Sequence, residues 1–418
     1  MIMKTLIQNL FLALAILASF NSQFSTAHAQ GSGVIWTAGG ASATWWSVAS
    51  SADGTKLYAA GAFGGLWAST DSGVTWTARD SSEGWILVNC SADGTKLVAS
   101  PTGVLPAFPV YTSTNSGMIF TQSANGPDNV TSLASSADGT KLAVASTCDI
   151  YTSADSGGNW VDQTESGCRS WSSIASSADG TKLVAVANGT YPVSGGWIYT
   201  STDSGATWTP RDSIRNWQSV ASSSNGNNLV AAVYNGSIYT STDSGTNWTA
   251  RDTSRTWQAV TSSADGTKLA AAVFNGPIYT STDSGTNWTA GEIAPEFTSG
   301  YANTDTNINR GWRAIASSAD GTKLVAVDYP GGGTNGLIYI SGTLIVPTLK
   351  VFAPFSSPFS NNVAISWQYP STGWTLQQNS NLTSGNWLPS SGVTNNGNVN
   401  YIITLPTGNM FYRLQLQQ

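Results

Sequence analysis

The chain has 418 residues, of which only 10% are charged, and its net charge is −6. This excludes the basic surface that nucleic acids and anionic membranes require. The only histidine, His28, lies in an N-terminal segment that we expect to be removed, so the mature chain can form neither an imidazole metal site nor a histidine-dependent catalytic triad. The three cysteines are too few and too scattered for a zinc cluster, and we expect no metal and no cofactor.

The first residues have the features of a secretory signal peptide. Lys4 precedes an apolar run over residues 10–20, and Ala27, His28 and Ala29 form a small-x-small cleavage site. We expect cleavage after Ala29, which defines residues 1–29 as the signal peptide and makes the protein secreted, extracellular or bound at the cell surface. An uncleaved anchor is the alternative, but the run is too short to span a bilayer.

One sequence unit is repeated seven times between Trp45 and Ile340. Its first half reads Trp-x-Ser/Ala-Val/Ile-x-Ser-Ser-Ala-Asp-Gly-Thr-Lys-Leu, with a turn centred on Asp53, Asp93, Asp138, Asp179, Asn225, Asp265 and Asp320. Successive turns lie 40 to 55 residues apart. A period of this length, with several short strands in each unit, is typical of propeller blades.

Each unit predicts four strands, which in the fifth unit cover residues 217–222, 228–233, 237–242 and 247–251. Asx-Gly between the first two is a strong hairpin signal, since both residues tolerate positive φ. The seventh unit lacks its fourth strand, and residues 34–38 can supply it. We therefore predict an all-β fold: a seven-bladed β-propeller over residues 30–342, closed by an N-terminal strand.

After the repeats the composition changes. Residues 343–360 are predicted to be a proline-punctuated linker, and residues 361–418 a small C-terminal β module resembling a sandwich. The module resembles those that end many secreted bacterial repeat proteins, and packing or surface attachment suits it better than catalysis.

The second turn of each unit resembles the Asp-box (BNR repeat) of the sialidase-like β-propeller family, Ser-x-Asp-x-Gly-x-x-Trp. Five copies are intact, and the resemblance covers about residues 34–341. In that family the box is a structural turn away from the ligand face. The resemblance therefore implies a structural role for Asp71, Asp155, Asp203, Asp243 and Asp283.

All large insertions fall in the two other connections, which open on one face because strands alternate in direction. Variable loops on a rigid scaffold usually carry function, although neutral drift explains them too. Cys148 and Cys168 lie in loops of this face, and they form either a disulfide or two free thiols.

Four arginines recur two residues before the first-strand tryptophan of consecutive units. Radial symmetry places them in an arc around the channel mouth, where guanidinium groups can bind carboxylates and indole rings can stack on a ligand. The alternative is that they form salt bridges between blades, with the tryptophans packed there. The predicted binding residues are Arg169, Arg215, Arg255, Arg310, Trp171, Trp217, Trp257 and Trp312.

Two functions remain open. We expect a non-catalytic monomer that binds a glycan or a protein segment on its loop-rich face, as photosystem-assembly propellers with Asp-boxes bind a protein. The alternative is an exo-sialidase-like glycoside hydrolase that uses Glu292, Glu296 and Tyr301. A third possibility is a purely structural propeller.

Overall fold

The structure is a computed structural model in which we describe residues 34–80, 84–102, 109–188, 195–293, 310–329, 336–342, 350–352, 363–368, 374–379, 388–390, 394–395, 399–404 and 411–416. In these residues the chain forms β-strands and one 3-10 turn, η1 (Thr164–Ser166). None of the described elements is a helix long and apolar enough to cross a bilayer. The predicted signal peptide lies outside the described residues.

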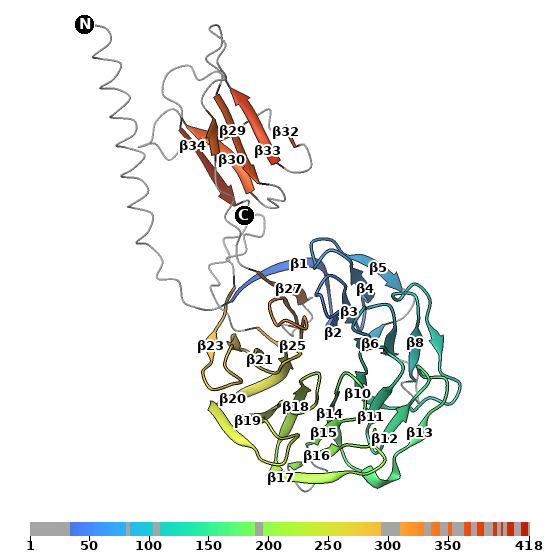
Figure 1. Cartoon of the computed structure of the whole chain (residues 1–418). Helices are drawn as coiled ribbons and strands as arrows, with labels where there is room; N and C mark the ends of the chain where they lie inside the picture. The colour runs from blue at the N-terminus through green and yellow to red at the C-terminus, as the bar shows by residue number, and fades with distance from the viewer. Residues whose placement is uncertain are drawn as a thin grey trace, which may run out of the picture.

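The strands of residues 35–342 form a ring of sheets around a central channel (Figure 1). Each repeat unit places its first strand innermost and its last strand at the rim. In chain order the strands are β1 (Ile35–Ala43), β2 (Trp45–Ser50), β3 (Leu57–Gly61), β4 (Gly65–Ser69), β5 (Thr77–Asp80), β6 (Trp85–Cys90), β7 (Leu97–Pro101), β8 (Tyr111–Ser113), β9 (Thr121–Gln122), β10 (Val130–Ser135), β11 (Leu142–Ser146), β12 (Ile150–Ser153), β13 (Val161–Asp162), β14 (Trp171–Ser176), β15 (Leu183–Ala187), β16 (Gly196–Ser201), β17 (Thr209–Arg215), β18 (Trp217–Ser222), β19 (Leu229–Ser241), β20 (Thr249–Ser262), β21 (Leu269–Val273), β22 (Ile278–Ser281), β23 (Thr289–Ala290), β24 (Glu292–Ile293), β25 (Trp312–Ser317), β26 (Leu324–Asp328) and β27 (Gly336–Gly342).

The ring contains six sheets, so the prediction of seven separate blades is wrong. Five sheets have four or five strands and correspond to one repeat unit each, whereas the fifth and sixth units share the six-stranded sheet β18-β19-β20-β21-β22-β23. The reason lies in one long strand. β20 runs without a break from the rim of the fifth unit into the innermost strand of the sixth. β19 is also long, but it joins the second and third strands of one unit through a shift in register at Asn235 and Gly236.

The core lies between neighbouring sheets. The second strand of each unit is buried along its whole length, as in β3, β7 and β11. Strands covered on both faces read as continuous apolar runs, and here the runs alternate alanine with valine or leucine so that closely spaced sheets can interdigitate. The first-strand tryptophan then packs on an aromatic residue of the fourth strand, as Trp217 does on Trp248, with ring centroids 6.2 Å apart.

Both turns of a unit are closed by hydrogen bonds in which a serine hydroxyl donates to the carboxylate of an aspartate and a backbone N–H group completes the turn. In the hairpin, the Ser91 hydroxyl donates to Asp93 at 2.6 Å and the backbone N–H of Thr95 donates to the same oxygen at 2.9 Å. In the second turn, the Ser241 hydroxyl donates to Asp243 at 2.8 Å and the N–H of Gly245 donates to Ser241 Oγ at 2.9 Å. Gly245 has φ +84°, a conformation that favours glycine.

The N-terminal strand closes the ring, as predicted. β1 pairs antiparallel with β27, with Trp36 opposite Ser341, and parallel with β24. Trp36 is 1% exposed and packs on Trp312 with a centroid distance of 6.3 Å. It therefore takes the place of the aromatic residue that the fourth strand supplies in other units.

A second closure runs around the hairpin turns. One backbone N–H in each turn donates to a carbonyl of the turn in the next unit, at 2.7 or 2.8 Å. The cycle visits all seven repeat units and returns to its start, in the order Ala52, Ala92, Ala137, Ala178, Ser224, Ala264, Ala319 and Ala52. All seven units therefore stand at equivalent positions in the ring, although two of them share a sheet.

The C-terminal strands form two sheets that do not join the ring. Their orders are β28-β29-β33-β32 and β31-β30-β34. β28 lies within the predicted linker and pairs with β29, so the linker is shorter than predicted. The strands are β28 (Lys350–Phe352), β29 (Val363–Gln368), β30 (Trp374–Asn379), β31 (Leu388–Pro389), β32 (Thr394–Asn395), β33 (Val399–Thr404) and β34 (Phe411–Leu416).

Candidate binding face

The disc has two faces with different connections. One carries the hairpin and Ser-x-Asp-x-Gly turns, and we call it the turn face. The opposite one, the loop face, carries the connections from second to third strand and from one unit to the next. Most residues of the insertions predicted on this face lie outside the described residues, namely residues 103–108, 189–194, 294–309 and 330–335.

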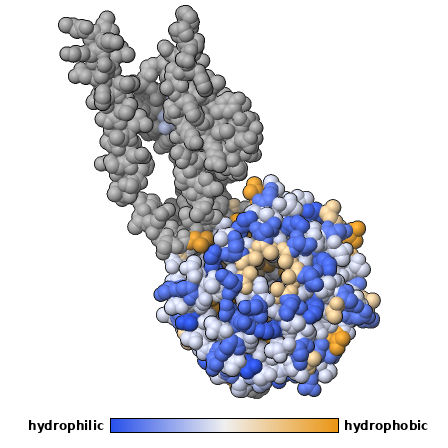
Figure 2. Space-filling model, viewed as in Figure 1, coloured by the Kyte–Doolittle hydropathy of each residue, from blue (hydrophilic) through white to orange (hydrophobic). Residues whose placement is uncertain are grey.

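The channel is hollow at its centre. Figure 2 shows the hollow on one face of the disc, ringed by weakly apolar atoms. A cavity of about 330 Å³ lies there, lined by the inner strands, for example by Val48 and Ser50 of β2 and by Ile315 and Ser317 of β25. Small apolar and hydroxyl side chains alternate along this wall.

The predicted arginines stand in a repeated column on the loop face. In the fifth unit the guanidinium of Arg215 lies over the ring of Tyr239, 4.3 Å from its centroid, and 5.9 Å from that of Trp217. Its Nε–H donates to Asp212 at 3.0 Å. The sixth unit repeats this, with Arg255 4.4 Å from the ring of Tyr279. We call each such group an arginine–tyrosine column.

The columns of the fourth and seventh units differ in their polar partners. Arg310 lies 4.9 Å from the ring of Tyr339 and pairs with Asp328 at 3.4 Å. Arg169 lies 4.5 Å from the ring of Tyr199 and donates to its hydroxyl from Nε at 2.7 Å and to the carbonyl of Ser166 from Nη1. Arg169 has no carboxylate partner in the described part of the chain. The positive charge of Arg169 therefore lacks the carboxylate that balances the charge of the other three column arginines.

The four tryptophans cannot stack on a ligand, so this part of the predicted site is wrong. Trp171 is 2% exposed, and Trp217, Trp257 and Trp312 are fully buried between sheets. The arginines keep part of their surface, with exposed side-chain fractions of 30% for Arg215 and 31% for Arg255. The salt bridges are formed within a unit rather than between blades. The group that reaches solvent is therefore the guanidinium, which lies over a tyrosine ring. This tyrosine was not predicted as a site residue, although the recurring sequence Ile-Tyr-Thr contains it in three of the four columns.

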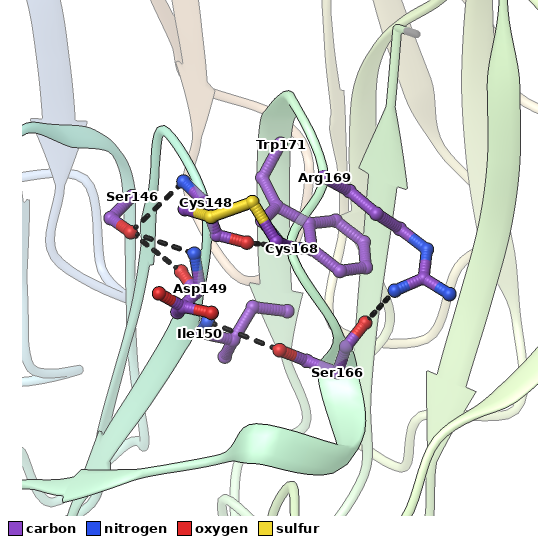
Figure 3. The surroundings of a disulfide bond; sticks show 8 residues. All are labelled: Ser146, Cys148, Asp149, Ile150, Ser166, Cys168, Arg169 and Trp171. Atoms are coloured by element: carbon purple, nitrogen blue, oxygen red, sulfur yellow. Dashed lines mark hydrogen bonds between the residues drawn. A yellow bond between two sulfur atoms is a disulfide. The ribbon is translucent and has the colours of Figure 1, made fainter. Parts of the chain in front are cut away.

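Cys148 and Cys168 form a disulfide in the structure. It joins the loop after β11 to the segment that carries Arg169, as Figure 3 shows. The carbonyl of Cys148 accepts a hydrogen bond from the Trp171 indole at 3.1 Å and one from the backbone N–H of Arg169 at 2.9 Å. The bridge thus fixes the backbone of Arg169, in the one column that has no aspartate.

Each of the remaining predicted site residues either has a structural role or lies outside the described residues. Backbone and side-chain N–H groups of Asn287 and the Ser281 hydroxyl hold the pKa of Asp283 at about 2, and Asp71, Asp155, Asp203 and Asp243 sit in the same turn on the turn face. Glu292 belongs to β24, at the closure of the ring. Glu296 and Tyr301 lie outside the described residues.

One buried carboxyl group lies near the loop face. Burial raises the pKa of Asp328, whose oxygens accept hydrogen bonds from the Leu337 N–H at 2.6 Å and from Arg310. The residue is fully buried, so it cannot touch a substrate. Across the described ranges, no group of three His, Cys, Asp or Glu residues is arranged to hold a metal ion.

Comparison with known proteins gives the fold. No family model and no curated protein matches the chain. YCF48 from Cyanidioschyzon merolae is 14% identical, with a TM-score of 0.54 over 73% of this chain and 98% of that one. YCF48 bound to D1 peptide is 16% identical, with a TM-score of 0.54 over 74% and 96%. The GH74 xyloglucanase from Xanthomonas campestris is 16% identical, with a TM-score of 0.56 over 80% and 59%. At such identities these similarities show the fold alone, and by fold this chain is a β-propeller.

Proposed function

We propose that the protein is a secreted, non-catalytic propeller that binds a protein segment on its loop face. The observation that carries this proposal is the row of arginine–tyrosine columns in consecutive units. Each column fixes a guanidinium group over a tyrosine ring while leaving part of it exposed. A guanidinium fixed in this way loses little side-chain entropy when it binds a carboxylate or a backbone carbonyl.

A protein segment suits this face better than a glycan. Sugar recognition uses open aromatic faces, and the four tryptophans predicted to offer them are buried. One neighbour in fold, YCF48, has been solved with a peptide bound, which supports the choice of partner. The five intact Ser-x-Asp-x-Gly-x-x-Trp turns support placing the chain among the Asp-box propellers, and residues 1–29 support secretion.

Panning of a phage-displayed random dodecapeptide library on the immobilised protein tests the proposal. We expect enrichment of peptides that contain Asp or Glu, and at least tenfold weaker binding of the selected peptides to the double variant Arg215→Gln/Arg255→Gln. The matched control is Arg211→Gln, which removes the same charge from an arginine bonded to Thr200 outside the columns. No enrichment on the native protein, or equal binding by the double variant, would reject the proposal.

The alternative activity, glycoside hydrolysis, is tested by a screen of fluorogenic glycosides that includes sialosides. Turnover that Glu296→Gln abolishes would replace the binding proposal by a catalytic one. Asp328 offers no route to this chemistry, because it is buried and bonded to Arg310.

A further inference from the structure

A bulge recurs near the start of every innermost strand. In β2 the ladder pairs Trp45 with Gly61 and Ser47 with Ala60, so that Trp46 is left without a partner. The same shift occurs in all seven units. A bulge turns the side chain of the extra residue away from the regular pleat, and bulges are frequent next to binding sites. The bulged residues are Trp46, Ile86, Thr131, Ser172, Gln218, Gln258 and Arg313.

Two neighbouring bulges carry residues unlike the rest. Arg313 of the seventh unit lies over the ring of Trp46 of the first unit, 4.8 Å from its centroid, and 5.5 Å from the ring of Tyr329. We call these three residues the mouth cluster. Trp46 is 40% exposed, whereas the tryptophan before it, Trp45, is fully buried. The cluster therefore forms where the two ends of the ring meet.

Arg313 differs from every arginine of the columns. It makes no hydrogen bond and no ion pair to the described residues, and its Nε–H is buried without a partner. Its contacts to these residues are the two aromatic faces, which hold the plane of the guanidinium and leave its N–H edge unsatisfied. A positive charge fixed by stacking, with unpaired donors, is suited to a bidentate carboxylate.

We propose that the mouth cluster binds a carboxylate of an acidic protein segment, with Arg313 as the anion-binding residue. Arg313 already covers part of the Trp46 ring, so the indole is not an open platform for a sugar, and this favours a peptide over an acidic glycan. The cavity of about 330 Å³ begins two residues further along the same strands. It gives a side chain next to the bound carboxylate room to enter the channel. The choice of a protein ligand rests on the proposed function, whereas the carboxylate site rests on Arg313.

Isothermal titration with three N-acetylated peptides tests the site: hexaglutamate with an amidated C-terminus, hexaglutamine with an amidated C-terminus, and hexaglutamine with a free C-terminal carboxylate. We expect hexaglutamate to bind the full chain and neutral hexaglutamine not to bind. Binding of the third probe distinguishes a terminal carboxylate from a side-chain one as the source of the anion. Arg313→Gln and Trp46→Ala should weaken hexaglutamate binding at least tenfold, and Arg313→Lys, which keeps the charge but not the fork, by a smaller factor.

Two controls separate this proposal from the previous one. Arg211→Gln should bind hexaglutamate as the native protein does, and unchanged thermal unfolding of Arg313→Lys excludes loss of fold. If Arg313→Gln binds normally while Arg215→Gln/Arg255→Gln does not, the mouth cluster is not the site and the column proposal stands. Tighter binding of oligogalacturonate than of hexaglutamate, or no binding of hexaglutamate by the native protein, overturns the inference.

Discussion

The backbone N–H of Ala319 donates a hydrogen bond to the carbonyl of Ala52 at 2.7 Å, which joins the last repeat unit to the first. The same junction holds the side chain of Lys323, whose Nζ donates to the carbonyl of Asp53 at 2.9 Å. β1 adds the third connection by pairing with β27. The seam is thus closed by backbone, side chain and sheet, and it carries the mouth cluster.

The seam makes Trp36 a sensitive position for stability. Trp36→Ala should lower the free energy of unfolding by about 3–5 kcal/mol, because it leaves a cavity against Trp312 where the ring is closed. Guanidinium chloride denaturation followed by circular dichroism measures the loss. Trp197→Ala is the control, since Trp197 is 39% exposed and its loss should change little. An unchanged midpoint for Trp36→Ala would contradict the role of β1 in closure.

The hairpin aspartates predict how stability depends on acid. The Ser91 hydroxyl, then the N–H and hydroxyl of Thr95, hold the pKa of Asp93 at about 2, below the usual 3.8. A carboxyl group whose pKa is lower in the folded state stabilises the fold above pH 4, and this contribution is lost as the pH falls from about 4 towards 2. Asp53, Asp138, Asp179 and Asp265 have the same lowered pKa, so acid unfolding should be cooperative within this window.

The fifth unit supplies the variant that tests this. Asn225 replaces the aspartate there, and its Oδ1 accepts from Ser223 at 2.8 Å and from the Asn227 N–H at 2.9 Å. Asp93→Asn should therefore keep the turn at pH 7 and reduce by about one the number of protons taken up on acid unfolding. Potentiometric titration measures this number of protons, and circular dichroism follows the unfolding. Asp128→Asn, at an exposed aspartate outside these turns, should change neither the midpoint nor the slope, and an equal change in both variants would refute the assignment.

The disulfide should stabilise the fourth unit. Its cysteines are 20 residues apart, and opening a loop of that size costs about 3 kcal/mol of stability. Cys148→Ser/Cys168→Ser should lose this amount in denaturant unfolding, and reduction of the native protein should reproduce the loss. Cys90→Ser is the control for changing a cysteine, and it should not respond to reductant differently from the native chain.

Cys90 itself should be inert. The residue is partly exposed, yet desolvation of its thiol raises the pKa of Cys90 to about 12. Because the thiolate is the reactive form, Ellman's reagent at pH 8 should label no thiol in the folded protein and one after unfolding in denaturant. Fast labelling of the folded chain would show that the thiol is accessible and ionised.

The repeat sequence predicts the propeller, the closure by residues 34–38 and the structural turns because all three depend on local patterns. The count of sheets was wrong because β20 continues without a break from the fourth strand of the fifth unit into the first strand of the sixth. The burial of the tryptophans in the predicted site also depends on a bulge. The ladder shifts register directly after the first-strand tryptophan, so the tryptophan is buried while the next residue, such as Trp46 or Arg313, is left outside the regular pairing. A sequence shows a repeated Trp-x-Ser, but it does not show the bulge.

The position of β1 also sets the order of events during synthesis. It is the first strand of the ring to leave the ribosome, and its partner β27 ends at Gly342, after every other strand of the ring. The nascent propeller therefore exists as an open arc with two unpaired ends until the seventh unit has emerged. The disc can therefore close only after the seventh unit has left the ribosome, and the half-built arc is the species that chaperones have to protect.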